Sequence, residues 1–442
     1  TSLFFIELEK SDGFDLLNYY KRRFLRIFPP LVLMIGSILP FTLLLPSDFR
    51  ANLAKQVAAA IGFATNRFEI LSGSSYEAQQ TPKLFIHTWT LSLEFLFYLI
   101  WGVLLFAVVM LLRYFNKNGK LLLGYTRLLV LLISSILIIF SIIRLQVTFD
   151  PKYLSYSYFS FGTHMFPFFI GAIISVFVGI KIDTHQREKF ANYPMNKWLL
   201  WTIIPLFCLL GLTIFGKFES IWTIRTNLIA ASLIAGILIV QFRILNERIT
   251  VEEPKVLTML ADTSYSVYLF HWPVWLIISN FVHQVFLAGV LSFVVSLACA
   301  SFVYYYIEPY FHGKELPTFM RSKLFYVGIF GIGLIGLVIA ISAPKISKIE
   351  QSINEAQISK TMTDLNQQGM LAQNLIDTGN DIFANTTWQN PALGFSTSTN
   401  PQSTQAVLKD VATVSDTVLN STQTVLGDSV MVGVVPYLTT IL

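Results

Sequence analysis

One apolar stretch of this sequence, residues 81–115, carries three side chains that can bind or transfer a proton. His87, Glu94 and Tyr98 lie in "IHTWTLSLEFLFY" at separations of seven and four residues, which places them on one face of an α-helix. A helix that begins near Leu84 carries Glu94 about 15 Å inward, close to a bilayer midplane. A carboxyl group there is costly unless it faces protein or water, so Glu94 is predicted to be functional, the alternative being a structural hydrogen bond between helices.

Paired cations mark the start of the first apolar run, in "YYKRRFLRIFPPL". Arg23 and Arg26 lie one helical turn apart, and Pro29 and Pro30 are expected in the opening turns of the span. Cationic residues at a cytoplasmic boundary ordinarily anchor topology. Two guanidinium groups on one face also suit bidentate capture of phosphates, as on a nucleotide-bearing acyl donor.

Aromatic and ionisable residues gather again in "ADTSYSVYLFHWPVW", residues 261–275. Asp262 and Thr263 are expected to cap a helix there. Pro273 has no N–H, so it should release a backbone carbonyl near His271. Tyr265, Tyr268 and His271 are therefore candidates to line a cavity, although the same residues could form an interfacial aromatic belt.

Two further groups could carry chemistry. His164, in "GTHMFPFF", lies near the start of an apolar run, where the alternative is a neutral histidine of the core. Ser429, in "VLGDSVMVG", follows a strand-like run, the geometry that exposes a nucleophilic hydroxyl. No histidine follows His312, so Ser429 cannot complete a catalytic triad from within this sequence.

The composition explains what must position these groups. Of 442 residues, 54% are hydrophobic and 13% charged, which predicts an all-α polytopic membrane protein. The net charge of +5 comes from basic residues in short loops rather than a patch interleaved with exposed aromatics, which argues against a nucleic-acid partner. No metal site is predicted.

Hydrophobic runs predict nine spans. They are expected at 27–46, 84–112, 122–145, 158–180, 198–216, 224–242, 260–281, 285–306 and 324–343. Lys and Arg cluster at 21–26, 113–127, 181–197, 243–255 and 314–323, and these clusters all fall on the cytoplasmic side if residues 53–66 are re-entrant or interfacial. Everything after about residue 344 is then outside the cell.

Three regions follow from this pattern. Residues 1–343 form the membrane domain, and residues 344–420 turn rich in Ser, Thr, Asn and Gln, which predicts an extracellular linker with a helical stretch around 349–376. Residues 421–442 are expected to begin a folded α/β domain.

Taken together, "RRFLRIFPPL", "LFIHTWTLSLEFLFYLIW" and "YSVYLFHWPV" resemble the motifs of the acyltransferase-3 family of membrane O-acyltransferases. The likeness covers nearly all of residues 1–343 and is greatest to the peptidoglycan O-acetyltransferases of Gram-positive bacteria, which carry an extracellular SGNH-type hydrolase domain. The segment "GDSVMVG" resembles the first block of that domain, with Ser429 at its nucleophile.

This resemblance implies a relay across the bacterial plasma membrane. A cytoplasmic acyl-CoA, expected to be acetyl-CoA, would bind near Arg23 and Arg26, and no cofactor would be held permanently. Glu94 and His87 would bind or relay the acyl group in a cavity lined by Tyr98, His164, Tyr265, Tyr268 and His271. Ser429 would place the group on a cell-wall glycan, expected to be peptidoglycan.

Two departures from the family pattern carry consequences. The essential family histidine, expected on the first transmembrane helix, would precede Thr1, so the sequence is expected to lack that catalytic base and to be inactive as a fragment. Where many relatives carry Arg, "GTHMFPFF" offers His164.

Two rival functions fit some of the same residues. A proton-coupled transporter or flippase of a cell-envelope precursor also uses buried Glu, His and Tyr, although no internal repeat is evident. A scaffold that presents an outer domain would tolerate apolar replacement of Arg23 and Glu94.

Overall fold

A computed structural model describes most of the chain up to residue 385. The described residues are 1–11, 13–72, 83–115, 119–150, 154–179, 184–216, 220–248, 254–311, 313, 315 and 322–385. They divide between two compact units, Thr1–Lys345 and Ile346–Leu442. The predicted linker end at 386–420, the predicted domain start at 421–442 and Ser429 lie outside the described residues.

The described part of the first unit is helical. Its longer helices are α1 (Ser2–Ser11), α2 (Leu16–Ile38), α3 (Leu53–Ile61), α5 (Trp89–Tyr114), α6 (Gly119–Thr148), α9 (Phe166–Phe177), α10 (Thr184–Ala191), α11 (Met195–Phe215), α12 (Leu228–Arg248), α13 (Lys255–Phe281), α14 (Val285–Phe302) and α16 (Lys323–Ile341). Shorter pieces are η1 (Leu39–Leu44), η2 (Ser47–Arg50), α4 (Thr65–Leu71), η3 (Ile86–Thr88), α7 (Leu154–Phe159), α8 (Phe161–His164), η5 (Thr223–Asn227), η6 (Val303–Ile307) and α15 (Glu308–Phe311).

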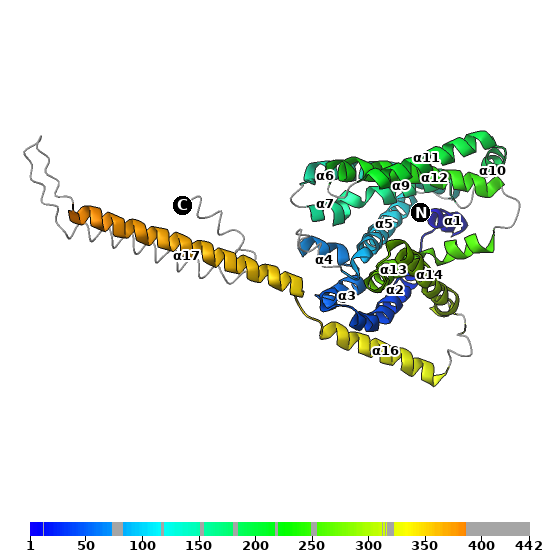
Figure 1. Ribbon diagram of the computed structural model, residues 1–442. Coiled ribbons are helices and arrows are strands. Elements are labelled where there is room, and N and C mark those ends of the chain that lie inside the picture. The colour runs from blue at the N-terminus through cyan, green and yellow to red at the C-terminus, as the bar shows by residue number, and fades with distance from the viewer. Residues whose placement is uncertain are drawn as a thin grey trace, which may run out of the picture. The chain divides into compact units, whose positions relative to one another are not determined.

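Helix α5 lies between two groups of helices (Figure 1). Its first turns pack with α2, α13 and the α3–α4 region around Leu31, Met34 and Leu269. Its later turns pack with α1, α6 and α9 around Trp101 and Phe169. Glu94 and Tyr98 therefore lie on the helix that joins the two halves of the core.

The close approach of α2 and α5 requires a glycine. A Cβ atom on Gly102 would lie 2.9 Å from ring atoms of both Tyr19 and Tyr20, closer than carbon atoms pack. Tyr20 also donates a hydrogen bond from its hydroxyl to the Leu99 carbonyl oxygen, at 2.7 Å. These contacts fix the position of α2, and hence of its arginines, along the axis of α5.

Helix α2 begins well before the predicted span. Asp15 caps it, because its carboxylate accepts the Asn18 N–H at 3.0 Å. The helix then continues through Pro29 and Pro30 to Ile38. The prolines therefore lie inside the helix rather than in its opening turns, and that part of the prediction was wrong.

Six helical segments in the described part of the chain are long and apolar enough to cross a membrane. They are Leu16–Leu44, Ile86–Tyr114, Gly119–Thr148, Met195–Phe215, Thr223–Arg248 and Val285–Phe311, and each overlaps a predicted span. The other three predicted spans are helical but shorter, broken or more polar. The count of nine spans is thus not confirmed.

The three exceptions have separate causes. The predicted span 158–180 is divided into α7, α8 and α9, with breaks at Ser160 and Met165. Helix α13 has the length, at 27 residues, but carries many polar side chains. Helix α16 is apolar along its 19 residues, and the segment of it whose side chains the structure describes without a gap, Gly331–Ile341, is too short to count.

The prediction that Asp262 and Thr263 cap a helix was wrong. Helix α13 starts at Lys255, after Pro254, so both residues lie inside it. The Thr263 hydroxyl donates to the Met259 carbonyl at 2.7 Å, the usual bond of a threonine inside a helix.

Residues 53–66, predicted to be re-entrant or interfacial, form two short helices. Helices α3 and α4 have nine and seven residues, and neither can cross a bilayer. Between them Phe63 adopts a φ of 50°, in the left-handed region, which turns the chain sharply. Helix α4 then packs against α5 and α7.

In the second unit the described residues contain one long helix, α17 (Lys348–Asn385). It includes the predicted helical stretch 349–376, which is confirmed. Most of its described side chains are exposed.

Candidate active site

The site is built where α13 meets the start of α5. Pro273 lies inside α13 and has no N–H, so the carbonyl of Leu269, four residues earlier, loses its helical donor. The His87 ring takes that place, with its Nε2 atom 3.0 Å from the Leu269 oxygen. The sequence thus correctly predicted a released carbonyl, and the structure identifies its partner.

Two hydroxyl groups secure the backbone of His87. The Tyr268 hydroxyl donates to the His87 carbonyl oxygen. The same hydroxyl lies 2.6 Å from the hydroxyl oxygen of Thr90. Residues of α13 therefore hold both the ring and the main chain of His87.

His271 lies on the open side of this junction. Its ring is 5.5 Å from that of His87 and nearly perpendicular to it, at 80°. Its Nδ1 atom lies 2.5 Å from the carbonyl oxygen of Tyr268. His87 is buried, whereas His271 is exposed, so the pair spans the boundary of the protein interior.

Glu94 and Tyr98 face each other across one turn of α5. The Tyr98 hydroxyl donates to Glu94 Oε1 at 2.5 Å, and both side chains are half-buried. The Glu94 charge also lies close enough to interact electrostatically with Tyr265 and Tyr268 of α13. Glu94 thus lies on the Tyr98 side of α5, near the tyrosines of α13.

Tyr265 connects this region to α2. Its hydroxyl donates to the Ile27 carbonyl oxygen at 2.9 Å. The exposed guanidinium of Arg26 lies within electrostatic range of the same hydroxyl. The α2 arginines and the α13 tyrosines therefore belong to one neighbourhood.

Arg23 completes the arrangement from the α2 side. Its guanidinium stacks on the Tyr19 ring, 3.5 Å from the centroid, and lies 5.2 Å from the centroid of Tyr98. A pocket of about 340 Å³ opens beside it. The pocket is lined by Tyr20, Lys21, Arg23, Phe24, Ile27, Phe95, Tyr98 and Leu99.

Two hydrogen-bonded groups, Tyr98 with Glu94 and Tyr268 with Thr90 and His87, lie near one another here, and together with Arg23 and Tyr265 we name them the polar seam. It consists of Arg23, Tyr98, Glu94, Tyr265, Tyr268, Thr90 and His87. It has a cation and a mixed apolar pocket at one end, a carboxyl group in the middle and an imidazole at the other. Such an arrangement can bind a charged group, hold a carbonyl and move a proton.

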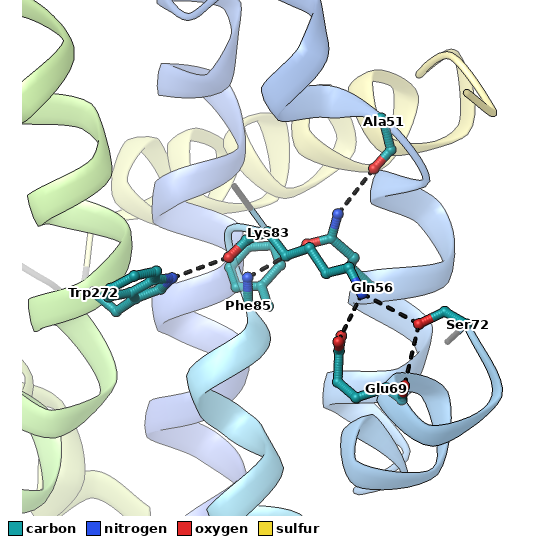
Figure 2. A network of polar contacts seen from close by, with 7 residues as sticks. All are labelled: Ala51, Gln56, Glu69, Ser72, Lys83, Phe85 and Trp272. Carbon is teal, nitrogen blue, oxygen red and sulfur yellow. Dashed lines mark hydrogen bonds and ion pairs between the residues drawn. The ribbon is translucent and has the colours of Figure 1, made fainter. Parts of the chain in front are cut away.

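A second polar network holds the start of α5 in place (Figure 2). The Lys83 ammonium lies 2.6 Å from a Glu69 carboxylate oxygen and 3.2 Å from the Ser72 hydroxyl. The Trp272 indole N–H donates to the Lys83 carbonyl at 3.0 Å. Burial raises the pKa of Glu69, and the neighbouring Lys83 offsets part of that rise. The network ties α4 and α13 to the segment that carries His87.

The structure places His164 in a different cluster. Its ring packs against Trp89, Tyr158 and Phe166, with the Trp89 centroid 5.7 Å away. The His164 side chain is buried, and its Nδ1 atom lies 3.4 Å from the Thr163 hydroxyl. His164 is therefore not brought to the polar seam, and its predicted cavity-lining role stays a prediction.

The family of the chain follows from its sequence. A family profile described as an acyltransferase domain matches residues 3–306, well over half of the chain. The chain belongs to the acyltransferase-3 family. The matched region contains every residue of the polar seam.

Curated relatives of this acyltransferase-3 domain are bacterial. The chain is 24% identical over 291 residues to the O-acetyltransferase OatA of Staphylococcus aureus strain NCTC 8325, covering 64% of this chain and 45% of that protein. It is 23% identical over 320 residues to the putative peptidoglycan O-acetyltransferase YrhL of Bacillus subtilis, covering 70% of this chain and 47% of that protein. The chain spans about half the length of these relatives. No solved structure matches it.

Sequence reasoning missed several residues of this candidate site. Thr90 precedes Glu94 by four residues, so helical spacing could have placed it on the same stripe. Tyr19 precedes Arg23 by four residues and could have been predicted as its stacking partner in the same way. Glu69 and Lys83 carry no local signal, because their pairing depends on how α4 folds back.

Within the residues that the structure describes, no three His, Cys, Asp or Glu side chains gather closely enough to hold a metal ion.

Proposed function

We propose that the protein transfers an acyl group, acetyl in the simplest case, from a cytoplasmic acyl-CoA to hydroxyl groups of an extracytoplasmic glycan. Membership of the acyltransferase-3 family supports acyl transfer. The names of the relatives, O-acetyltransferase and putative peptidoglycan O-acetyltransferase, favour acetyl as the group and peptidoglycan as the acceptor. The protein would act in the bacterial plasma membrane, with its second unit outside the cell.

The observation that carries this proposal is the inward position of Glu94 within the polar seam. A carboxyl group inside an apolar bundle is expensive to keep, and here it lies between the arginine end and the imidazole end. A structural role would need only the Tyr98 hydrogen bond. The continuation to Tyr265, Tyr268 and His87 is what a path for a reacting group requires.

Each end of the seam has a role in the proposed transfer. Arg23, with Arg26 on the next turn, binds the phosphates of the donor, since planar guanidinium groups match phosphate oxygens. The adjacent pocket accepts the arm that carries the thioester. Glu94 and Tyr98 orient the acyl carbonyl or move a proton, and His271 keeps the far end polar. Ser429 would receive the acyl group in the outer domain and pass it to the sugar.

The decisive test is Glu94→Gln in the full-length protein. Membranes are supplied with labelled acetyl-CoA, and label bound covalently to outer glycan is measured. Loss of a positioned acid or base should reduce transfer by about 10²–10⁴-fold. The matched control is Glu188→Gln, because Glu188 is exposed on α10 and remote in sequence from the seam.

Two results would contradict the proposal. Undiminished transfer by Glu94→Gln would remove Glu94 from the chemistry. If wild-type membranes place no label on glycan but take up or export an envelope precursor in a proton-dependent way, the chain is a transporter instead.

A further inference from the structure

The bond between His87 and Leu269 determines where the imidazole proton lies. A backbone carbonyl oxygen can only accept a hydrogen bond, so the Nε2 atom facing it at 3.0 Å must carry the hydrogen. In a neutral imidazole the other nitrogen then has a lone pair. That atom, Nδ1 of His87, is buried and has no hydrogen-bond partner in the described part of the chain.

Pro273 is the cause of this arrangement. In a regular helix the N–H at position 273 would bond to the Leu269 carbonyl and compete with the imidazole. Proline removes that donor, so the carbonyl is left for a side chain from another helix. Both Pro273 and Leu269 are buried, so no bulk solvent replaces His87 there.

The His87 ring has little freedom to turn over. On one side the Trp272 indole bonds the Lys83 carbonyl at 3.0 Å. On the other side Tyr268 bonds the carbonyl of His87 itself. Three successive contacts from one face of α13 thus fix the segment 83–87, and a flipped ring would lose the Leu269 bond.

We propose that Pro273 is a positioning residue that locks His87 in the Nε2–H form, which makes Nδ1 of His87 the proton acceptor of the polar seam. This rests on the proposed acyl transfer. A hydroxyl group that attacks the acyl carbon gives its proton to Nδ1 as the new C–O bond forms. The C–S bond of the acyl thioester then breaks, and Nδ1 returns the proton to the departing thiolate sulfur.

The first experiment measures the tautomer directly. Full-length protein is labelled with ¹⁵N-histidine in lipid nanodiscs, and the His87 resonances are assigned by their absence in His87→Gln. We expect the Nδ1 resonance of the wild type to be that of an unprotonated nitrogen. In Pro273→Ala the restored N–H competes for the Leu269 carbonyl, so the two tautomers should mix and the Nδ1 signal should move toward that of a protonated nitrogen.

The second experiment measures acetyl transfer by the same variants. Pro273→Ala should lower kcat about tenfold or more and leave the KM for acetyl-CoA within about twofold, since the base is misdirected but donor binding is untouched. Pro205→Ala is the matched control, because Pro205 is also a buried proline inside a helix, α11. That variant should keep both the histidine spectrum and kcat.

His87→Gln covers the case in which Pro273→Ala does not fold. A glutamine amide can still donate to the Leu269 carbonyl but has no basic nitrogen. It should keep the melting temperature of the wild type while kcat falls about 10²–10⁴-fold.

Several outcomes would overturn the inference. They are a protonated Nδ1 in the wild type, an unchanged spectrum and kcat in a folded Pro273→Ala, or full activity of His87→Gln. If the spectra behave as expected but the wild type transfers no acetyl group, the proposed function fails and the tautomer assignment stands.

Discussion

The neutral partner of Glu94 is the feature that separates this carboxyl group from an ordinary buried ion pair. Its hydrogen-bond donor is the Tyr98 phenol at 2.5 Å, while the Arg23 guanidinium lies over the rings of Tyr19 and Tyr98. A hydrogen bond from a neutral donor leaves the carboxyl group able to respond to a substrate charge. A direct Arg–Glu pair would have fixed it.

Stacking of Arg23 gives a prediction about donor affinity. Arg23→Lys keeps the charge but loses the planar stack on Tyr19, so the KM for acetyl-CoA should rise about 2–30-fold, the range of a cation–π contact. The maximal rate should change little, because Lys still attracts phosphate. Steady-state transfer assays on membranes measure both quantities.

Arg22→Lys is the control for this experiment. Arg22 pairs with Glu7 at 2.6 Å, its side chain is 49% exposed, and it does not line the pocket. A rise in KM equal to that of Arg23→Lys would show that the positive charge of the whole segment matters and that the stack does not.

Local spacing in the sequence was enough to predict the contacts within one helix. The Glu94 and Tyr98 pair follows from a separation of four residues, and the released carbonyl follows from Pro273. The partner of that carbonyl could not be predicted, because His87 is far away in the sequence and its approach depends on how α5 and α13 pack. His164 was expected in the same cavity because it lies near the start of an apolar run, where many relatives carry Arg, and packing put it against Trp89 instead.

Prediction of the helices had the same limit. Long apolar runs such as Gly119–Thr148 were recognised because hydrophobicity decides the structure there. The divided segment of α7, α8 and α9 was taken as one span because it is apolar throughout, although Pro167 in the first turn of α9 signals a helix start. The start of α2 was placed too late, because its first turns are polar and aromatic rather than aliphatic.

The ion pair of α4 with the start of α5 predicts a specific loss of stability. Lys83→Met leaves the Glu69 carboxylate, which is 2% exposed, without its cation. Removing one partner of a buried pair costs about 3–5 kcal/mol, so the melting temperature in detergent should fall clearly. The double variant Lys83→Met with Glu69→Gln should recover much of the loss, because no charge is left buried.

The same variant should show a pH dependence of definite sign. Burial raises the pKa of Glu69, and loss of Lys83 removes the charge that lowers it. The folded state then holds a proton at pH values where the unfolded chain has released it, so stability falls as pH rises. The deficit of Lys83→Met should be largest at neutral pH and shrink toward acidic pH. A deficit independent of pH would mean that lost packing, not the buried charge, destabilises the protein.

The proposed transfer requires the protein to bind its two kinds of substrate from opposite sides of a membrane. The chain spans about half the length of relatives whose names include O-acetyltransferase, and the acyltransferase match ends at residue 306. What the described residues supply is a seam with different chemistry at its two ends. The seam can serve in acyl transfer across a membrane only if its two ends face different compartments.

Charge distribution predicts which compartment each end faces, and this can be measured. Cys208 and Cys299 are unpaired and are first replaced by Ser and Ala. Single cysteines then replace Lys120, Gln284 or Lys360, which are all exposed. In intact cells a membrane-impermeant maleimide should label Gln284→Cys, between α13 and α14, and Lys360→Cys on α17. Lys120→Cys, within a basic cluster, should react only after lysis, because Lys and Arg favour cytoplasmic loops. Equal labelling of Lys120→Cys and Gln284→Cys in intact cells would place both ends of the seam on the same side of the membrane. That result would contradict transfer of an acyl group along the seam.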